Sequence, residues 1–228
     1  YTKVEDSFRL EYGLRDGMTI GGSIELASVR GTAQIGTIVT PTLPPQTTNI
    51  YATGWNYGVA DPRLYLRQRL WQNDSSVLSA QATTKFPSYF SNEQLPQSGS
   101  DKISQEVRLL AGTNFDWLKK SHFADVEAAY EYRPGQDADF LHADATLGLK
   151  FLDSVMLMPQ LFSTWRLGGD NGAYTQSGND SYDLVKGQLS AIVPVTDSVS
   201  LQASAFNHLY ARNTGGGSGL TLGVWYKP

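Results

Sequence analysis

Apolar and polar side chains alternate one by one along residues 123–133. The apolar positions are Ala124, Val126, Ala128, Tyr130 and Tyr132, and the charged positions between them are Asp125, Glu127, Glu131 and Arg133. A period of two predicts a β-strand, because successive side chains of a strand point to opposite faces of a sheet. The pattern recurs in about ten more segments, and no segment reads as a second buried layer. We therefore expect a barrel whose apolar face meets lipid and whose polar face lines a lumen.

Eleven segments of the chain read as strands. They are residues 2–14, 18–29, 61–71, 77–86, 103–115, 123–133, 140–152, 156–166, 182–193, 199–210 and 220–226. Pro159 and Pro194 lie in or near strands, where proline cannot donate a ladder hydrogen bond, so a bulge or a strand end is expected at each. Residues 30–56 are rich in Thr, Pro and Gly and are expected to form a long connection, with a short strand near Asn49–Ala52.

Short and long connections alternate along the chain, apart from residues 134–139, which are short where a long connection is expected. The short ones are residues 15–17, 72–76, 118–121, 153–155 and 197–198, and the long ones are 30–56, 91–102, 168–181 and 213–219. Short periplasmic turns and long outer loops are typical of bacterial outer-membrane barrels, which have an even number of strands. The predicted fold is therefore all-β, a single antiparallel transmembrane β-barrel of about twelve strands, with residues 1–228 as one domain. One ascending strand is expected before Tyr1 or within the first long connection.

Composition agrees with a barrel and excludes other classes. Of the 228 residues, 40% are hydrophobic and 18% charged, and no run of about eighteen apolar residues exists, which excludes a transmembrane helix. The net charge of -4 argues against a nucleic-acid partner. Aromatic side chains fall on the apolar face, mostly near strand ends, as an interfacial girdle requires: Tyr12, Phe86, Phe115, Tyr130, Tyr132, Phe151, Trp165 and Tyr226.

The polar face carries the candidate functional residues. The side chains predicted to line the lumen are Arg63, Arg67, Arg69, Lys85, Glu106, Arg108, Asp125, Glu127, Glu131, His142, Asp144 and Lys150. One hypothesis is a cationic wall on the third and fourth strands that faces an acidic wall on the fifth to seventh strands and sets selectivity. The other is that these charges pair across strands and fill a narrow lumen.

Catalysis and partner docking are the alternative functions. His142 shares the lumenal face with Asp144 and Glu127, which suggests a membrane-embedded hydrolase, whereas His208 and Ser204 lie too far apart on their strand to form a nucleophile pair. No metal, P-loop or dinucleotide motif occurs, so we expect a protein that is not an enzyme and holds neither metal nor cofactor. Residues 31–56 are long enough to dock a protein partner or to fold inward as a plug. The other expected partners are outer-membrane lipid and lipopolysaccharide.

Two segments resemble known outer-membrane sequences. Residues 58–71, from Gly-Val-Ala-Asp-Pro to Leu-Trp, followed by Thr-Lys-Phe-Pro at 84–87, resemble a hairpin of the outer-membrane family of the meta pathway of phenol degradation. Ala60 stands where that family has a second glycine. The resemblance implies an outer-membrane channel for small solutes, including hydrophobic or aromatic compounds. The alternation of residues 220–226 is similar to the C-terminal signal by which the assembly machinery reads the last strand of a barrel in the bacterial outer membrane. The leading hypothesis is a passive channel in that membrane.

Overall fold

The computed structural model describes residues 2–40, 46–136, 138–152, 155–168 and 181–227, and the regular structure within them is entirely β. The strands are β1 (Thr2–Arg15), β2 (Met18–Thr40), β3 (Gln46–Gln72), β4 (Ser76–Lys85), β5 (Tyr89–Phe90), β6 (Ser104–Trp117), β7 (Lys120–Tyr132), β8 (Asp139–Leu152), β9 (Val155–Leu167), β10 (Asp183–Pro194), β11 (Val199–Arg212) and β12 (Ser218–Tyr226). Every ladder between them is antiparallel. The predicted all-β antiparallel fold is confirmed.

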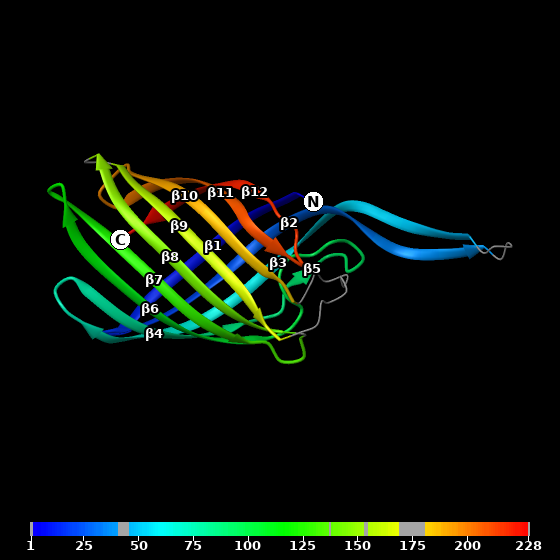
Figure 1. Cartoon of the computed structure of the whole chain (residues 1–228), viewed down its shortest axis with the longest axis horizontal. Helices are drawn as coiled ribbons and strands as arrows, with labels where there is room; N and C mark the ends of the chain where they lie inside the picture. Colours follow the sequence, from blue (N-terminus) through cyan, green and yellow to red (C-terminus); the bar gives the residue numbers. More distant parts are fainter. Residues whose placement is uncertain (1, 41–45, 137, 153–154, 169–180, 228) are drawn as a thin grey trace.

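The strands form one sheet that follows the order of the chain. Its order is β1-β2-β3-β4-β6-β7-β8-β9-β10-β11-β12, and the two-residue β5 pairs with β3. Figure 1 shows the sheet curling around an interior with its strands tilted. β1 and β12 are the two edge strands of this sheet, and no ladder joins them in the described part of the chain. Because strand direction alternates from each strand to the next, these two edge strands run in the same direction. A closing strand before Tyr1 stays a prediction.

The first long connection differs from its prediction. β2 continues to Thr40 and β3 already begins at Gln46, so that paired residues run from Arg30↔Trp55 to Thr40↔Gln46. The prediction of an irregular connection was therefore wrong, and residues 49–52 belong to β3. Thr, Ile and Val favour extended pairing even where a segment is too polar to read as a strand. The resulting two-stranded ribbon projects well beyond the rest of the sheet, at the right of Figure 1.

The two prolines have different outcomes. Pro194 ends β10, as predicted. Pro159 lies within β9 and pairs with Leu189 without a register shift, so the expected bulge or strand end is absent there. On its other side, the β8–β9 ladder has no pairs between Thr146↔Gln160 and Leu149↔Leu157. This local interruption accommodates the missing N–H of the proline while the strand continues.

The apolar side chains of the sheet point outward. Leu10 is 78% exposed, Val107 62% and Leu222 88%, and a buried apolar cluster of the described residues contains only Ala27, Val29, Ala60 and Phe90. A soluble protein does not leave a contiguous apolar surface of this extent in water. No helix in the described ranges is long and apolar enough to cross a membrane. The exposed apolar face is therefore the surface that lipid would cover.

Candidate functional site

The concave face of the sheet is identified by side-chain contacts that pass over an intervening strand. Lys85 on β4 donates to Glu131 on β7 across β6, with Nζ and Oε2 2.6 Å apart. Tyr65 on β3 donates to Glu11 on β1 across β2, with 2.5 Å between the oxygens. Such contacts are possible only on the inside of a curled sheet. We call the space in front of this face the lumen.

The residues predicted to line the lumen lie on five strands. β3 carries Arg63, Arg67 and Arg69, β4 carries Lys85, β6 carries Glu106 and Arg108, β7 carries Asp125, Glu127 and Glu131, and β8 carries His142, Asp144 and Lys150. Contacts join most of them, and no described carboxylate pairs with Lys150. Their role as the lining of an open pore stays a prediction.

Arg108 is the centre of one ion network. Its Nε lies 2.9 Å from Oε1 of Glu106, and its Nη1 lies 2.9 Å from Oδ2 of Asp144 and also contacts Glu127. The side chain of Glu106 is 3% exposed and that of Arg108 17%. A carboxylate so deeply buried requires a cationic partner, because losing hydration without compensation costs several kcal/mol. The network therefore ties β6, β7 and β8 together from inside.

Lys85 joins a second group of carboxylates to this network. Its Nζ lies 3.1 Å from Oε2 of Glu106 and 2.6 Å from Oε2 of Glu131. Glu131 also accepts a hydrogen bond of 2.6 Å from the Ser104 hydroxyl, and its Oε2 lies 2.9 Å from Nε2 of His142. Ligand atoms of Glu106, Glu131 and His142 lie within 4.8 Å of one another, so they could hold a metal ion. In this arrangement the Lys85 ammonium contacts both carboxylates, and Glu106 also contacts Arg108.

The cationic residues of β3 are paired as well. Arg67 contacts Glu11 over 3.0 Å, Arg63 contacts Glu25 over 3.3 Å, and Arg69 contacts Asp16 over 2.5 Å. These contacts therefore do not form the hypothesised cationic wall that faces an acidic wall. Opposite charges instead pair with each other on adjacent strands or across one intervening strand. The carboxylate partners on β1 and β2 were missing from the predicted site, although alternation already placed Glu11 and Glu25 on the polar face.

His142 bridges two side chains of the lumenal face. Its Nδ1 lies 3.1 Å from the Thr164 hydroxyl and its Nε2 2.9 Å from Glu131. The backbone at His142 is paired on both sides, with Ala129 on β7 and Thr164 on β9. The other candidate, His208, contacts the Gly215 carbonyl through Nδ1, and Ser204 accepts a hydrogen bond from Gln202. These contacts favour a structural role for both histidines.

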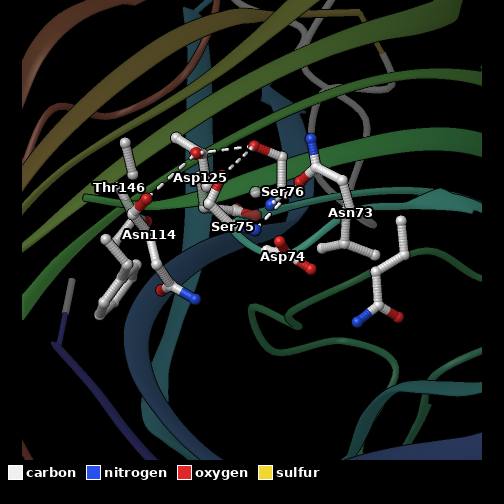
Figure 2. A pocket seen from close by; sticks show the side chains of 13 residues that line it. Asn73, Asp74, Ser75, Ser76, Asn114, Asp125 and Thr146 are labelled. Atoms are coloured by element: carbon white, nitrogen blue, oxygen red, sulfur yellow. Dashed lines mark hydrogen bonds between the residues drawn. The ribbon is translucent and has the colours of Figure 1, made fainter.

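A hollow of about 360 Å³ lies at the rim where the short turns are. The turn between β3 and β4 and parts of β6, β7 and β8 line it, and polar side chains predominate (Figure 2). Asn73 accepts hydrogen bonds from the backbone N–H groups of Ser75 and Ser76, and the Ser76 hydroxyl contacts that of Thr113. Asp125, one of the predicted lining residues, faces this hollow (Figure 2). Polar side chains therefore line the hollow at this end of the lumen.

The opposite rim is covered by the segment between β4 and β6. Asn56 on β3 is fully buried, and its Nδ2 donates to the carbonyls of Asn92 and Pro96 over 2.7 and 3.2 Å. Its Oδ1 accepts from the Ser91 hydroxyl and the Asn92 backbone. Phe90 packs in the cluster with Ala27, Val29 and Ala60, which fills the adjacent part of the interior. The sequence predicted residues 91–102 as a loop, and the structure folds its first part back onto β3.

Beside it, the start of β10 closes in on β7 and β8. The guanidinium of Arg133 lies 4.2 Å from the ring centroid of Phe140, whose ring is 4.8 Å from that of Tyr182. Tyr182 precedes β10, outside the strands, and burial raises its pKa to about 12. Its phenol therefore stays neutral at any physiological pH. Together with the segment that Asn56 holds, this cluster lies at the rim opposite the short turns. We call this rim the outer mouth, because the long connections are predicted to lie outside.

The chain has a known structural relative. No protein-family model matches it, and no curated protein matches its sequence. Among solved structures, the crystal structure of an outer membrane channel from Pseudomonas putida F1 is similar, with a TM-score of 0.60 and 17% sequence identity over 97% of this chain and 81% of that chain. At this identity the likeness concerns the fold. The chain therefore has the β-barrel fold seen in an outer membrane channel.

Proposed function

We propose that this protein is a channel of the bacterial outer membrane through which small solutes pass without an energy source. One observation carries the proposal: the curled sheet has leucine and valine exposed on its outer face and ionised networks on its inner face. Leu222 on the outer face is 88% exposed, whereas Glu106 on the inner face is 4% exposed. Lipid is the solvent that makes such an outer face stable, and a polar interior is what a water-filled passage requires.

The paired charges would act on solutes through the positions of the individual charged groups, and not through a net charge of the lumen. Because most lumenal cations already have carboxylate partners, a polar solute meets alternating donors and acceptors along the passage. The hollow at the short-turn rim supplies an entrance from the periplasmic side, and the outer mouth is the narrow point. We extend the proposal to hydrophobic and aromatic solutes on the resemblance of residues 58–87 to the family of the meta pathway of phenol degradation.

The proposal is tested by single-channel recording of the full-length protein in planar lipid bilayers. We expect discrete conductance steps whose cation-to-anion permeability ratio rises in Arg67→Glu, because this variant adds negative charge to the lumen beside Glu11. Lys119→Glu makes the same charge change on the exposed turn before β7 and serves as the matched control. A bilayer that stays silent with correctly folded protein would overturn the channel and favour a sealed barrel.

The ribbon of β2 and β3 supports docking as a second function. Residues 31–60 contain no Asp, Glu, Lys, Arg or His, and from Gly31 on the outer edge of β2 has no paired strand in the described part. Uncharged, unpaired strand edges are templates for adding another strand. Deleting residues 32–53 joins Gly31 to Gly54, which are register partners and suit a two-residue hairpin. Loss of a stoichiometric co-purifying protein on this deletion would support docking, and unchanged composition would exclude it.

A further inference from the structure

Lys186 differs from the paired lumenal cations. Its Nζ lies 4.3 Å from the ring centroid of Phe162 on β9 and 5.5 Å from that of Phe206 on β11. In register, Lys186 on β10 stands between Phe162 and His208. The ammonium is thus held against two aromatic rings by cation–π attraction.

No described side chain or carbonyl accepts a hydrogen bond from this ammonium, and no described carboxylate pairs with it. The nearest carboxylate along the ladder is Asp144, whose register partner is Phe162. Phe162 therefore stands between Asp144 and Lys186 on the strand that separates them. Asp144 itself is taken by Arg108, at 2.9 Å.

The wall around Lys186 is polar and uncharged. Gln188 and Ser190 both donate to Oε1 of Gln160, over 3.1 and 2.9 Å, and Gln202 donates to Ser190 and Ser204. β9, β11 and β12 contain no Asp or Glu, and the single carboxylate of β10 is Asp183 at its outer end, beside Arg166. Arg166 and Arg212 lie at the same end as Asp183, so Lys186 is the one lysine or arginine in the middle of these four strands. The charges of Asp144, Glu5 and Glu25 act on its ammonium from a distance, but no described group accepts a hydrogen bond from it.

We propose that Lys186, Phe162 and Phe206 form a solute subsite for a monocarboxylate that carries a flat, apolar body. The carboxylate would accept charge-assisted hydrogen bonds from the Lys186 ammonium. The apolar body would lie against the two half-buried phenylalanine rings, where aromatic pairs prefer offset or edge-to-face contact. This subsite names a solute class for the proposed channel and rests on that function.

The opposite wall restricts the charge of the solute. The networks of β4, β6, β7 and β8 join four carboxylates to two cations, which leaves an excess of negative charge there; the carboxylates are those of Glu106, Glu127, Glu131 and Asp144, and the cations are Lys85 and Arg108. A di- or trianion would be repelled by this wall more strongly than a monoanion. The subsite therefore favours a single carboxylate over phosphate or a dicarboxylate.

The experiment measures equilibrium binding of benzoate, acetate and benzyl alcohol to the detergent-solubilised full-length protein by ligand-observed NMR titration. We expect saturable benzoate binding that weakens about ten-fold or more in Lys186→Gln, since the charge-assisted hydrogen bond is lost. Benzyl alcohol, which lacks the charge, should bind Lys186→Gln and the wild type equally. Phe162→Leu should weaken both ring compounds and leave acetate unchanged. Lys119→Gln, on the exposed turn, is the matched control.

Lys186→Arg keeps the charge and should retain benzoate binding, so it tests the proposal even if Lys186→Gln folds poorly by circular dichroism. Benzoate binding that is unsaturable, or equal in wild type and folded Lys186→Gln, would overturn the subsite. Bilayer recordings on the same preparations separate the two proposals. Conductance without benzoate block removes the subsite alone, whereas saturable benzoate binding with a silent bilayer keeps the subsite and removes the channel.

Discussion

Arg108 on β6 contacts Asp144 on β8 by reaching over β7, with 2.9 Å between Nη1 and Oδ2. The guanidinium also contacts Glu106 and Glu127, so a single side chain neutralises carboxylates from three strands. In a curled sheet with few apolar side chains inside, such contacts take over the role that a hydrophobic core has in a soluble domain.

Removing this cation should destabilise the barrel. Arg108→Ala leaves Glu127 and Asp144 without their cationic partner and Glu106 with Lys85 alone. Breaking a buried ion pair costs about 3–5 kcal/mol. We expect the free energy of unfolding, measured by denaturant titration in lipid vesicles, to fall toward that range. Arg108→Lys retains one charge but not the fork of donors, so it should lose less. Equal stability of Arg108→Ala and wild type would show that water already screens this network.

Lys85→Ala should convert the second network into a metal site. Without the ammonium, Glu131 loses its lysine and Glu106 keeps only Arg108, so the two carboxylates and the His142 imidazole offer a donor set that suits Zn²⁺. Isothermal titration calorimetry should show Zn²⁺ binding to Lys85→Ala that is at least about ten-fold tighter than to wild type. The double variant Lys85→Ala/His142→Ala should lose this gain. If it binds Zn²⁺ as tightly as the single variant, the metal lies elsewhere.

Asn56→Ala should release the covering of the outer mouth. The side chain makes four hydrogen bonds to residues 91, 92 and 96, and leaving buried partners unsatisfied costs about 1–3 kcal/mol. Hydrogen exchange of residues 91–96 should accelerate, and single-channel conductance should rise. Asn207→Ala, which truncates an exposed side chain of the same type on β11, is the control and should change neither measurement. Faster exchange with unchanged conductance would place the narrow point elsewhere.

A charged side chain introduced on the outer face should destabilise the protein more, the deeper its position lies in the lipid. Leu109 lies in the middle part of β6 and is 52% exposed, whereas Gln105 lies near the strand end. Arginine in the middle of a lipid-facing strand costs about 2–4 kcal/mol and near the interface about 0–1 kcal/mol. Leu109→Arg should therefore lose more unfolding free energy in lipid vesicles than Gln105→Arg. Equal losses for the two variants would contradict a lipid-facing position of Leu109.

Gly148→Ala should disturb the pair of β7 and β8. A methyl group at Gly148 would overlap the ring of Phe123, which lies over this glycine as its register partner. Overpacking of this kind costs about 1–3 kcal/mol in unfolding free energy. Gly112→Ala is the matched control, because its methyl group would meet Asp125 and Val77 only at ordinary contact distances of 3.5 and 3.6 Å. A loss in Gly112→Ala as large as in Gly148→Ala would assign the effect to glycine itself rather than to the ring.

Sequence periodicity predicted most strand positions to within a few residues, because alternation depends only on the two faces of a strand. Periodicity failed in the ribbon of β2 and β3, where the polar composition suggests an irregular connection but the backbones pair as strands. Thr32 and Thr53 belong to a paired ribbon although their segments read as polar connections, and their hydroxyls lie 2.7 Å apart across it. It also failed to find Asn56, whose role depends on backbone groups some 36–40 residues away.

The alternation of side chains alone determined that this chain forms a curled antiparallel sheet with an apolar outside and an ionised inside. Only the tertiary structure decided which charges meet, that Lys85 reaches Glu131 across a strand, and that Lys186 faces aromatic rings instead of a carboxylate. The physical reason is that strand period is a local property of the backbone, whereas partners across the lumen depend on register, tilt and curvature, which arise from all strands together.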